Sequence, residues 1–92
     1  MNYYALIYET VGDMITKRAP FRDEHLRFIR EAHARGELFM AGALGDPPDG
    51  ALVVFRAQSP AVAEEFARRD PYVINGLIPR WTVRPWNIVA GP

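Results

Sequence analysis

Residues 20–35 read PFRDEHLRFIREAHAR, and their spacing predicts an amphipathic helix. With an advance of about 100° per residue, four apolar side chains fall on the same side as His25. These residues are Phe21, Phe28, Ile29 and Ala32. Charged side chains occupy the opposite side, so the imidazole of His25 is predicted to point toward the core of the domain.

An imidazole in such a position has two interpretations. It can take up or release a proton near neutral pH, which suits a catalytic acid or base. It can also be a structural histidine whose nitrogens bond to a backbone carbonyl or a buried water. The pattern of the helix alone leaves both interpretations open.

The segments on either side of this helix alternate between strand and helix patterns. Runs of aromatic and β-branched residues predict strands over residues 3–8, 38–44, 51–57 and 81–89. A second helix is expected to start at Pro60 after a capping Ser59, and to be interrupted at Asp70-Pro71. Gly36 is expected to end the first helix, and the proline- and glycine-rich residues 45–50 to form a loop.

This order of elements predicts a single α+β domain over residues 1–92 with a ferredoxin-like β-α-β-β-α-β fold. Such a fold has a four-stranded antiparallel sheet with two helices on one face. Both faces of the first and third predicted strands are apolar, for example Leu6 and Ile7 on opposite sides. Because two short helices cover one face only, a second copy is expected to cover the other, which makes the protein a homodimer.

Composition excludes several classes of function. The 11 basic and 11 acidic residues cancel, and no basic run offers a surface for nucleic acid. The chain has no cysteine, which removes disulfides and thiolate chemistry. No signal peptide and no membrane-spanning run are recognised, so a soluble cytoplasmic protein is expected.

A second candidate lies at Asp70-Pro71-Tyr72. Aspartate followed by proline is typical of a helix N-cap, which would make Asp70 purely structural. The carboxylate could instead orient the imidazole of His25, as an acid orients a catalytic base. One carboxylate can do both, and spacing along the sequence does not decide between these roles.

Other polar and aromatic residues suggest a binding site. Arg22 lies one helical turn before His25 and could bind an anionic group of a substrate. Tyr4, with Tyr3 and Tyr8, could line a pocket or belong to the core. His33, with no third ligand beside it, makes a poor metal site with His25. No cofactor motif is present either, so neither metal nor cofactor is expected.

Several short motifs together resemble the YciI-like, or YCII-related, family across nearly the whole chain. They are Lys17-Arg18, Arg22-x-x-His25-Leu26, Gly36, Ala41-Gly42, Asp70-Pro71-Tyr72, Gly76 and Val83-x-Pro85-Trp86. The resemblance implies a ferredoxin-like fold, dimerisation into an α/β barrel, and a His–Asp active site at His25 and Asp70. The chain departs from the commoner family pattern at Ala43, where proline is frequent.

The family resemblance also implies a range of activities, because one relative is associated with removal of halide from a chlorinated hydroxyquinol. We expect elimination, isomerisation or hydrolysis of a small cyclic or aromatic compound, with His25 as general acid or base. The predicted substrate-binding residues are Arg22, Tyr4, Gly42 and Tyr72. The alternatives are a dimer that only binds a small ligand and, by analogy of fold, a cofactor-free monooxygenase.

Overall fold

The computed structural model describes all residues 1–92 and contains one sheet flanked by helices. The elements are β1 (Asn2–Glu9), α1 (Met14–Arg18), η1 (Ala19–Phe21), α2 (Arg22–Ala34), β2 (Leu38–Leu44), β3 (Gly50–Ala57), α3 (Ala61–Arg69), α4 (Pro71–Ile74) and β4 (Arg80–Trp86). No helix is long and apolar enough to cross a membrane.

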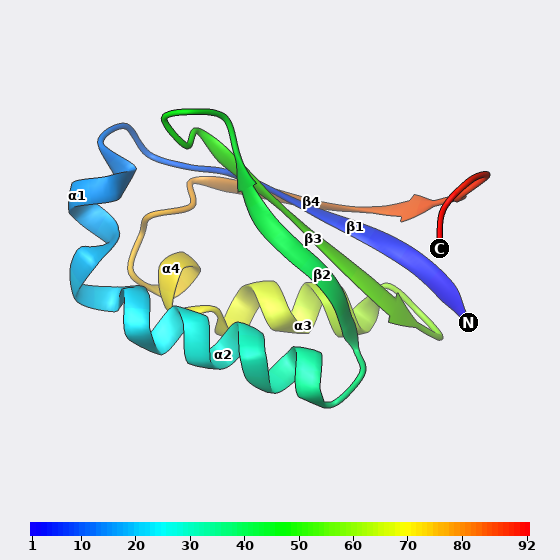
Figure 1. Ribbon diagram of the computed structural model, residues 1–92. Helices are drawn as coiled ribbons and strands as arrows, with labels where there is room; N and C mark the ends of the chain where they lie inside the picture. Colours follow the sequence, from blue (N-terminus) through cyan, green and yellow to red (C-terminus); the bar gives the residue numbers. More distant parts are fainter.

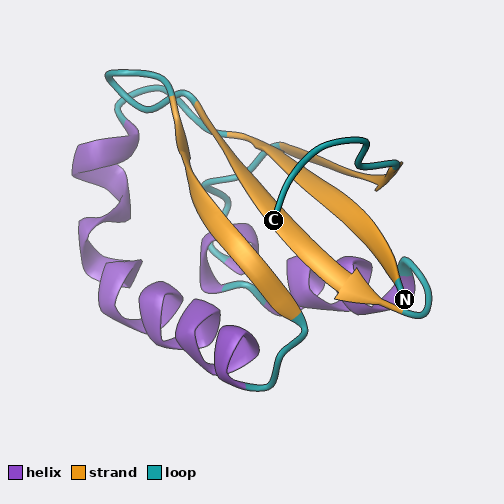
Figure 2. Cartoon of the chain, turned by 45° about the vertical axis from the view of Figure 1, so that its right-hand side comes forward, coloured by secondary structure: helices purple, strands orange, loops and turns teal.

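The four strands form one antiparallel sheet in the order β2-β3-β1-β4. The helices α2 and α3 lie side by side on the same face of this sheet (Figures 1 and 2). The two chain termini lie at the same end of the sheet, opposite the end at which α1 is found (Figure 1). This is the ferredoxin-like α+β arrangement that the order of elements predicted.

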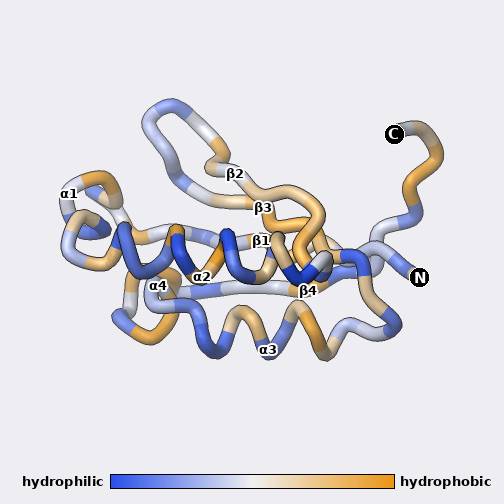
Figure 3. The backbone as a smooth tube through the Cα atoms, turned by 60° about the horizontal axis from the view of Figure 1, so that its bottom comes forward, coloured by the Kyte–Doolittle hydropathy of each residue, from blue (hydrophilic) through white to orange (hydrophobic).

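The core lies between the sheet and the helices. Strand register places Tyr4 opposite Phe55 and Leu6 opposite Val53, so these four side chains share the face toward the helices. All four are buried. Hydrophobic and hydrophilic positions alternate along α2 and α3 (Figure 3), as expected for helices that cover a sheet on one side only.

The other face of the sheet carries exposed apolar side chains. The alternation of the strands turns Ile7, Met40, Leu44 and Trp86 to this face, and each of them is exposed by 36% or more. The protein therefore has the second apolar face that the sequence predicted. The helices α2 and α3 lie on the opposite face and leave these side chains uncovered (Figure 2).

Most predicted boundaries are within one residue of those observed, and the larger differences are three. The sequence predicted no helix between the first strand and the main helix, but residues Met14–Arg18 form a short helix, α1. The main helix begins at Arg22 rather than Pro20, because Pro20 lies in the 3₁₀ turn η1. Strand β4 ends at Trp86 rather than at residue 89, since its neighbour β1 has its last paired residue at Tyr3.

Candidate active site

His25 and Asp70 meet in the interior of the domain. His25 lies in the first half of α2, and Asp70 lies at the junction of α3 and α4. The Nδ1 atom of His25 is 2.7 Å from Oδ1 of Asp70, and both residues are buried. The two residues are 45 positions apart in the sequence, yet the contact forms within one subunit.

The carboxylate of Asp70 has no exposed surface and accepts three hydrogen bonds. The hydroxyl of Tyr8 donates to Oδ2 at 2.7 Å, while His25 Nδ1 and the backbone N–H of Tyr72 donate to Oδ1 at 2.7 and 3.0 Å. Asp70 is the N-cap of α4, with extended backbone, and Pro71 occupies the first helical position. The two roles considered for Asp70, helix cap and partner of the histidine, are therefore combined in one carboxylate.

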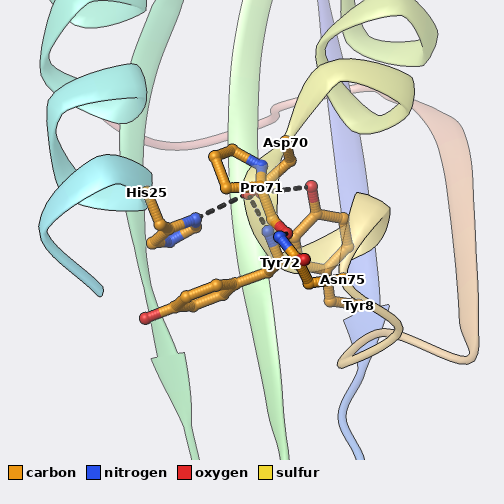
Figure 4. A network of polar contacts seen from close by, with 6 residues as sticks. All are labelled: Tyr8, His25, Asp70, Pro71, Tyr72 and Asn75. Carbon is orange, nitrogen blue, oxygen red and sulfur yellow. Dashed lines mark hydrogen bonds and ion pairs between the residues drawn. The ribbon is translucent and has the colours of Figure 1, made fainter. Parts of the chain in front are cut away.

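This arrangement determines which nitrogen of His25 can act on a ligand. An ionised carboxylate only accepts hydrogen bonds, so Nδ1 carries the proton and donates to Asp70. In the neutral ring, Nε2 is then an unprotonated acceptor, and it makes no hydrogen bond to the protein. The ring of Tyr72 stacks on the imidazole at a centroid distance of 3.6 Å and an angle of 6°. Figure 4 shows this stack and the bonds that converge on Asp70.

Tyr8 also belongs to this site. The sequence indicated only a core or pocket position for it and did not predict its hydrogen bond to Asp70. It lies near the end of β1, opposite Ala51. A Cβ atom at the neighbouring Gly50 would lie 2.9 Å from the carbonyl oxygen of Tyr8, so glycine is needed for β3 to approach here. Burial raises the pKa of the Tyr8 phenol far above its ordinary value, and the charge and hydrogen bond of Asp70 raise it further.

The raised pKa of Tyr8 predicts a loss of stability at alkaline pH. Above pH about 10, unfolded chains release this phenolic proton while the folded protein retains it, so the free energy of unfolding falls as pH rises. One such group contributes a slope of about 1.4 kcal/mol per pH unit. We expect Tyr8→Phe to reduce the slope by that amount in urea denaturation between pH 10 and 11.5. Equal slopes for the variant and the wild type would contradict this assignment.

A pocket of about 260 Å³ opens beside His25. Its walls are mostly apolar and come from α1, α2 and the ends of the β2 and β3 strands next to their connecting loop. The polar side chains that line it are those of Tyr8, Thr10, Arg18, Arg22, His25 and Tyr72. Since an apolar cavity of about 150 Å³ accommodates benzene, this pocket has room for one ring with substituents.

The pocket brings together most of the predicted binding residues. Arg22, Gly42 and Tyr72 line it together with His25. A Cβ atom at Gly42 would meet no atom within 4 Å, so nothing in this subunit requires glycine there. The prediction for Tyr4 is not supported by the geometry, because Tyr4 does not line the pocket. It lies four residues before Tyr8 on β1, about 13 Å away, and packs in the core beside Phe55.

The chemistry available to this group of residues is proton transfer. The neutral ring of His25 would present Nε2 as a proton acceptor next to an apolar pocket, and Asp70 would stabilise the imidazolium that forms when Nε2 accepts a proton. No three His, Cys, Asp or Glu side chains lie close enough together to hold a metal ion.

Comparisons with known sequences agree with this fold. The profile of the YCII-related domain matches residues 1–87. An uncharacterised protein of Haemophilus influenzae is 27% identical to the chain over 96 residues, which cover 95% of this chain and 98% of the relative. The protein YciI of Escherichia coli O6:H1 is 28% identical over 95 residues, which cover 94% of this chain and 97% of the relative.

Two solved structures share the fold. One is 5-chloro-2-hydroxyhydroquinone dehydrochlorinase (TftG) from Burkholderia phenoliruptrix AC1100, in complex with 2,5-dihydroxybenzoquinone. It superposes with a TM-score of 0.76 at 17% identity and covers 92% of this chain and 93% of its own. The other is an antibiotic biosynthesis monooxygenase, with a TM-score of 0.60, 13% identity, and coverage of 98% and 100%.

Proposed function

The chain belongs to the YCII-related domain family, and we propose that it is a small-molecule enzyme in which His25 and Asp70 perform general acid–base catalysis. One observation carries this proposal. The Nδ1 atom of His25 is held by Asp70 at 2.7 Å, which leaves Nε2 free at the edge of the pocket. A catalytic base and the group that orients it need this geometry.

The proposed reaction is an elimination, isomerisation or hydrolysis of a small cyclic or aromatic compound. In an elimination of HCl, Nε2 would accept a proton from the substrate, the electron pair left behind would form the new double bond, and the carbon–chlorine electron pair would leave with chloride. This step consumes no oxidant or reductant. The likeness in fold to a dehydrochlorinase supports this class of reaction as the first to test.

Three further residues have proposed roles in substrate binding. Arg22 would contact an anionic group, and Tyr72 would contact the substrate from its position beside the imidazole of His25. Gly42 would contribute only its backbone to the wall of the pocket. Asp70 would contact His25 and not the substrate, because it has no exposed surface.

The test is a screen for turnover that depends on His25. The purified protein is incubated with 5-chloro-2-hydroxyhydroquinone and with a panel of lactones and cyclic enols, and products and chloride release are followed by mass spectrometry and ion chromatography. We expect at least one compound to be converted by the wild type and not by His25→Gln. Conversion that is equal in both proteins would contradict acid–base catalysis by His25.

Binding without catalysis is the second candidate, and the apolar character of the pocket walls supports it. A binding module would keep its ligand in His25→Gln and convert nothing. Monooxygenase chemistry rests on likeness of fold alone, at 13% identity. The same screen, run with and without dioxygen, separates it from acid–base catalysis.

We also propose a cytoplasmic location, which the absence of cysteine supports.

We propose that two copies associate through the open face of the sheet. Exposed apolar side chains on this face, among them Met40 and Leu44, would be removed from water by a second sheet. We expect the mass of a dimer in light scattering at micromolar concentration, and a shift toward monomer in Met40→Asp. His33→Asp, which adds the same acidic group to an exposed position on α2, is the control. A stable wild-type monomer at all concentrations would contradict this assembly.

A further inference from the structure

Two arginines line the pocket without an acidic partner. Arg18 is the last residue of α1, and Arg22 is the first residue of α2. Both side chains line the pocket beside His25. The ion pairs of the structure join His25 to Asp70, Arg35 to Glu37, and Arg80 to Glu9. The guanidinium groups of Arg18 and Arg22 therefore have no carboxylate within ion-pair distance.

The same pocket contains two hydroxyl groups without hydrogen-bond partners. The phenolic oxygen of Tyr72 is buried and unpartnered, and so is the hydroxyl oxygen of Thr10. Tyr72 as a whole is only 5% exposed. Its ring extends along His25 with the hydroxyl directed away from Asp70 (Figure 4). A buried hydroxyl without a hydrogen-bond partner is uncommon in proteins. A ligand in the pocket would supply the missing hydrogen bond.

Two arginines are the only charged residues, apart from His25, that line the pocket beside Tyr72. Burial raises the pKa of the Tyr72 phenol and the negative charge of Asp70 adds to this, whereas the positive charges of Arg22 and Arg18 act to lower it. Both guanidinium groups are thus close enough to the phenolic oxygen to affect its titration. No carboxylate lines the pocket, because Asp70 is buried out of reach of it. A negative charge placed here would meet two cations on the pocket wall, and the one carboxylate that acts on the Tyr72 phenol, Asp70, is bonded to His25.

We propose that this pocket binds a small planar organic anion, such as a ring that carries a carboxylate or an acidic ring oxygen. Arg18 and Arg22 would bind the negatively charged oxygen, and the hydroxyl of Tyr72 would donate a hydrogen bond to it. The ring would lie against the apolar walls, for which 260 Å³ is sufficient. This inference rests on the proposed function because it concerns the same pocket. Binding of the anion does not require proton transfer by His25.

The experiment compares acids with their neutral amides of the same shape. Benzoate is paired with benzamide and 2-furoate with 2-furamide, and each is titrated into ¹⁵N-labelled protein at pH 7.5 while amide shifts are followed. A charged hydrogen bond to an arginine changes affinity by about ten- to a hundredfold. We expect each acid to bind at least tenfold more tightly than its amide, and this preference to be lost in Arg18→Gln and Arg22→Gln.

Three further variants make the result specific. Arg30→Gln removes the same charge from α2 outside the pocket and should keep the wild-type preference. Arg22→Lys should restore part of the preference that Arg22→Gln loses. Tyr72→Phe keeps the stacking ring but removes the hydroxyl, so it should weaken binding of the acids several-fold and leave the amides unchanged.

The outcomes separate this inference from the proposed catalysis. Equal affinity for acids and amides, or no binding of any of the four compounds, would overturn the anion site. A preference for acids that persists in Arg18→Gln and Arg22→Gln would overturn it as well. Retention of the preference in His25→Gln would support the anion site even if no substrate is ever converted, since failure of the catalytic proposal appears only in the turnover screen.

Discussion

His25→Gln is expected to reduce turnover about 10²–10⁴-fold, the usual contribution of a general acid or base. The amide of glutamine cannot take up a proton at neutral pH, and it can still contact the carboxylate of Asp70. The change therefore removes proton transfer with little loss of packing. The measurement is kcat with a compound identified in the screen, and circular dichroism checks that the variant is folded.

His33→Gln provides the matched control, because His33 lies on the same helix and is exposed. It should leave kcat unchanged. A folded His25→Gln with wild-type kcat would show that the chemistry lies elsewhere. Loss of folding in His25→Gln would instead favour a structural histidine. The interpretation as a catalytic base would then depend on which of the two ring nitrogens of His25 carries the proton.

Asp70→Ala is expected to lower the free energy of unfolding by about 3–7 kcal/mol. Loss of an N-cap costs about 1 kcal/mol, and each buried donor left without an acceptor costs about 1–3 kcal/mol. The donors left in this way would be the hydroxyl of Tyr8 and Nδ1 of His25. Urea denaturation measures the change, which is a large part of the stability of a small domain.

Asp70→Asn separates the structural contribution of this residue from its charge. Asparagine can still cap α4 and accept one hydrogen bond, so it should destabilise the protein less than alanine does. Asp23→Ala, an exposed change in the first turn of α2, should cost less than about 1 kcal/mol and serves as the control. Equal costs for Asp23→Ala and Asp70→Ala would contradict the hydrogen-bond network described for the site.

The helical period was sufficient to predict which way His25 points. Apolar residues on one side of α2 had to face the sheet, and Phe28 does pack against Phe66 of α3. The cap at Asp70 could also be predicted, because aspartate followed by proline has a local reason to begin a helix. Their contact could not be predicted from spacing, since it depends on how α2 packs beside the junction of α3 and α4.

The different positions of the two tyrosines of β1 could not be predicted from the sequence. Tyr4 and Tyr8 point to the same face of the same strand, and alternation treats them alike. Only the packing of α1 and α2 over one end of the sheet makes Tyr8 part of the pocket and leaves Tyr4 in the core. Helix α1 itself was missed because five residues carry too little periodicity to be recognised.

The protonation of the two nitrogens of His25 decides whether Asp70 holds the imidazole as a base, and it can be measured without a substrate. Long-range ¹H–¹⁵N correlation spectra of labelled protein distinguish a protonated from an unprotonated ring nitrogen. For the neutral ring, the contact with Asp70 predicts a proton on Nδ1 and a bare Nε2 that faces the pocket. A neutral ring with the proton on Nε2 and a bare Nδ1 would contradict it, because Asp70 would then not hold the imidazole as a base.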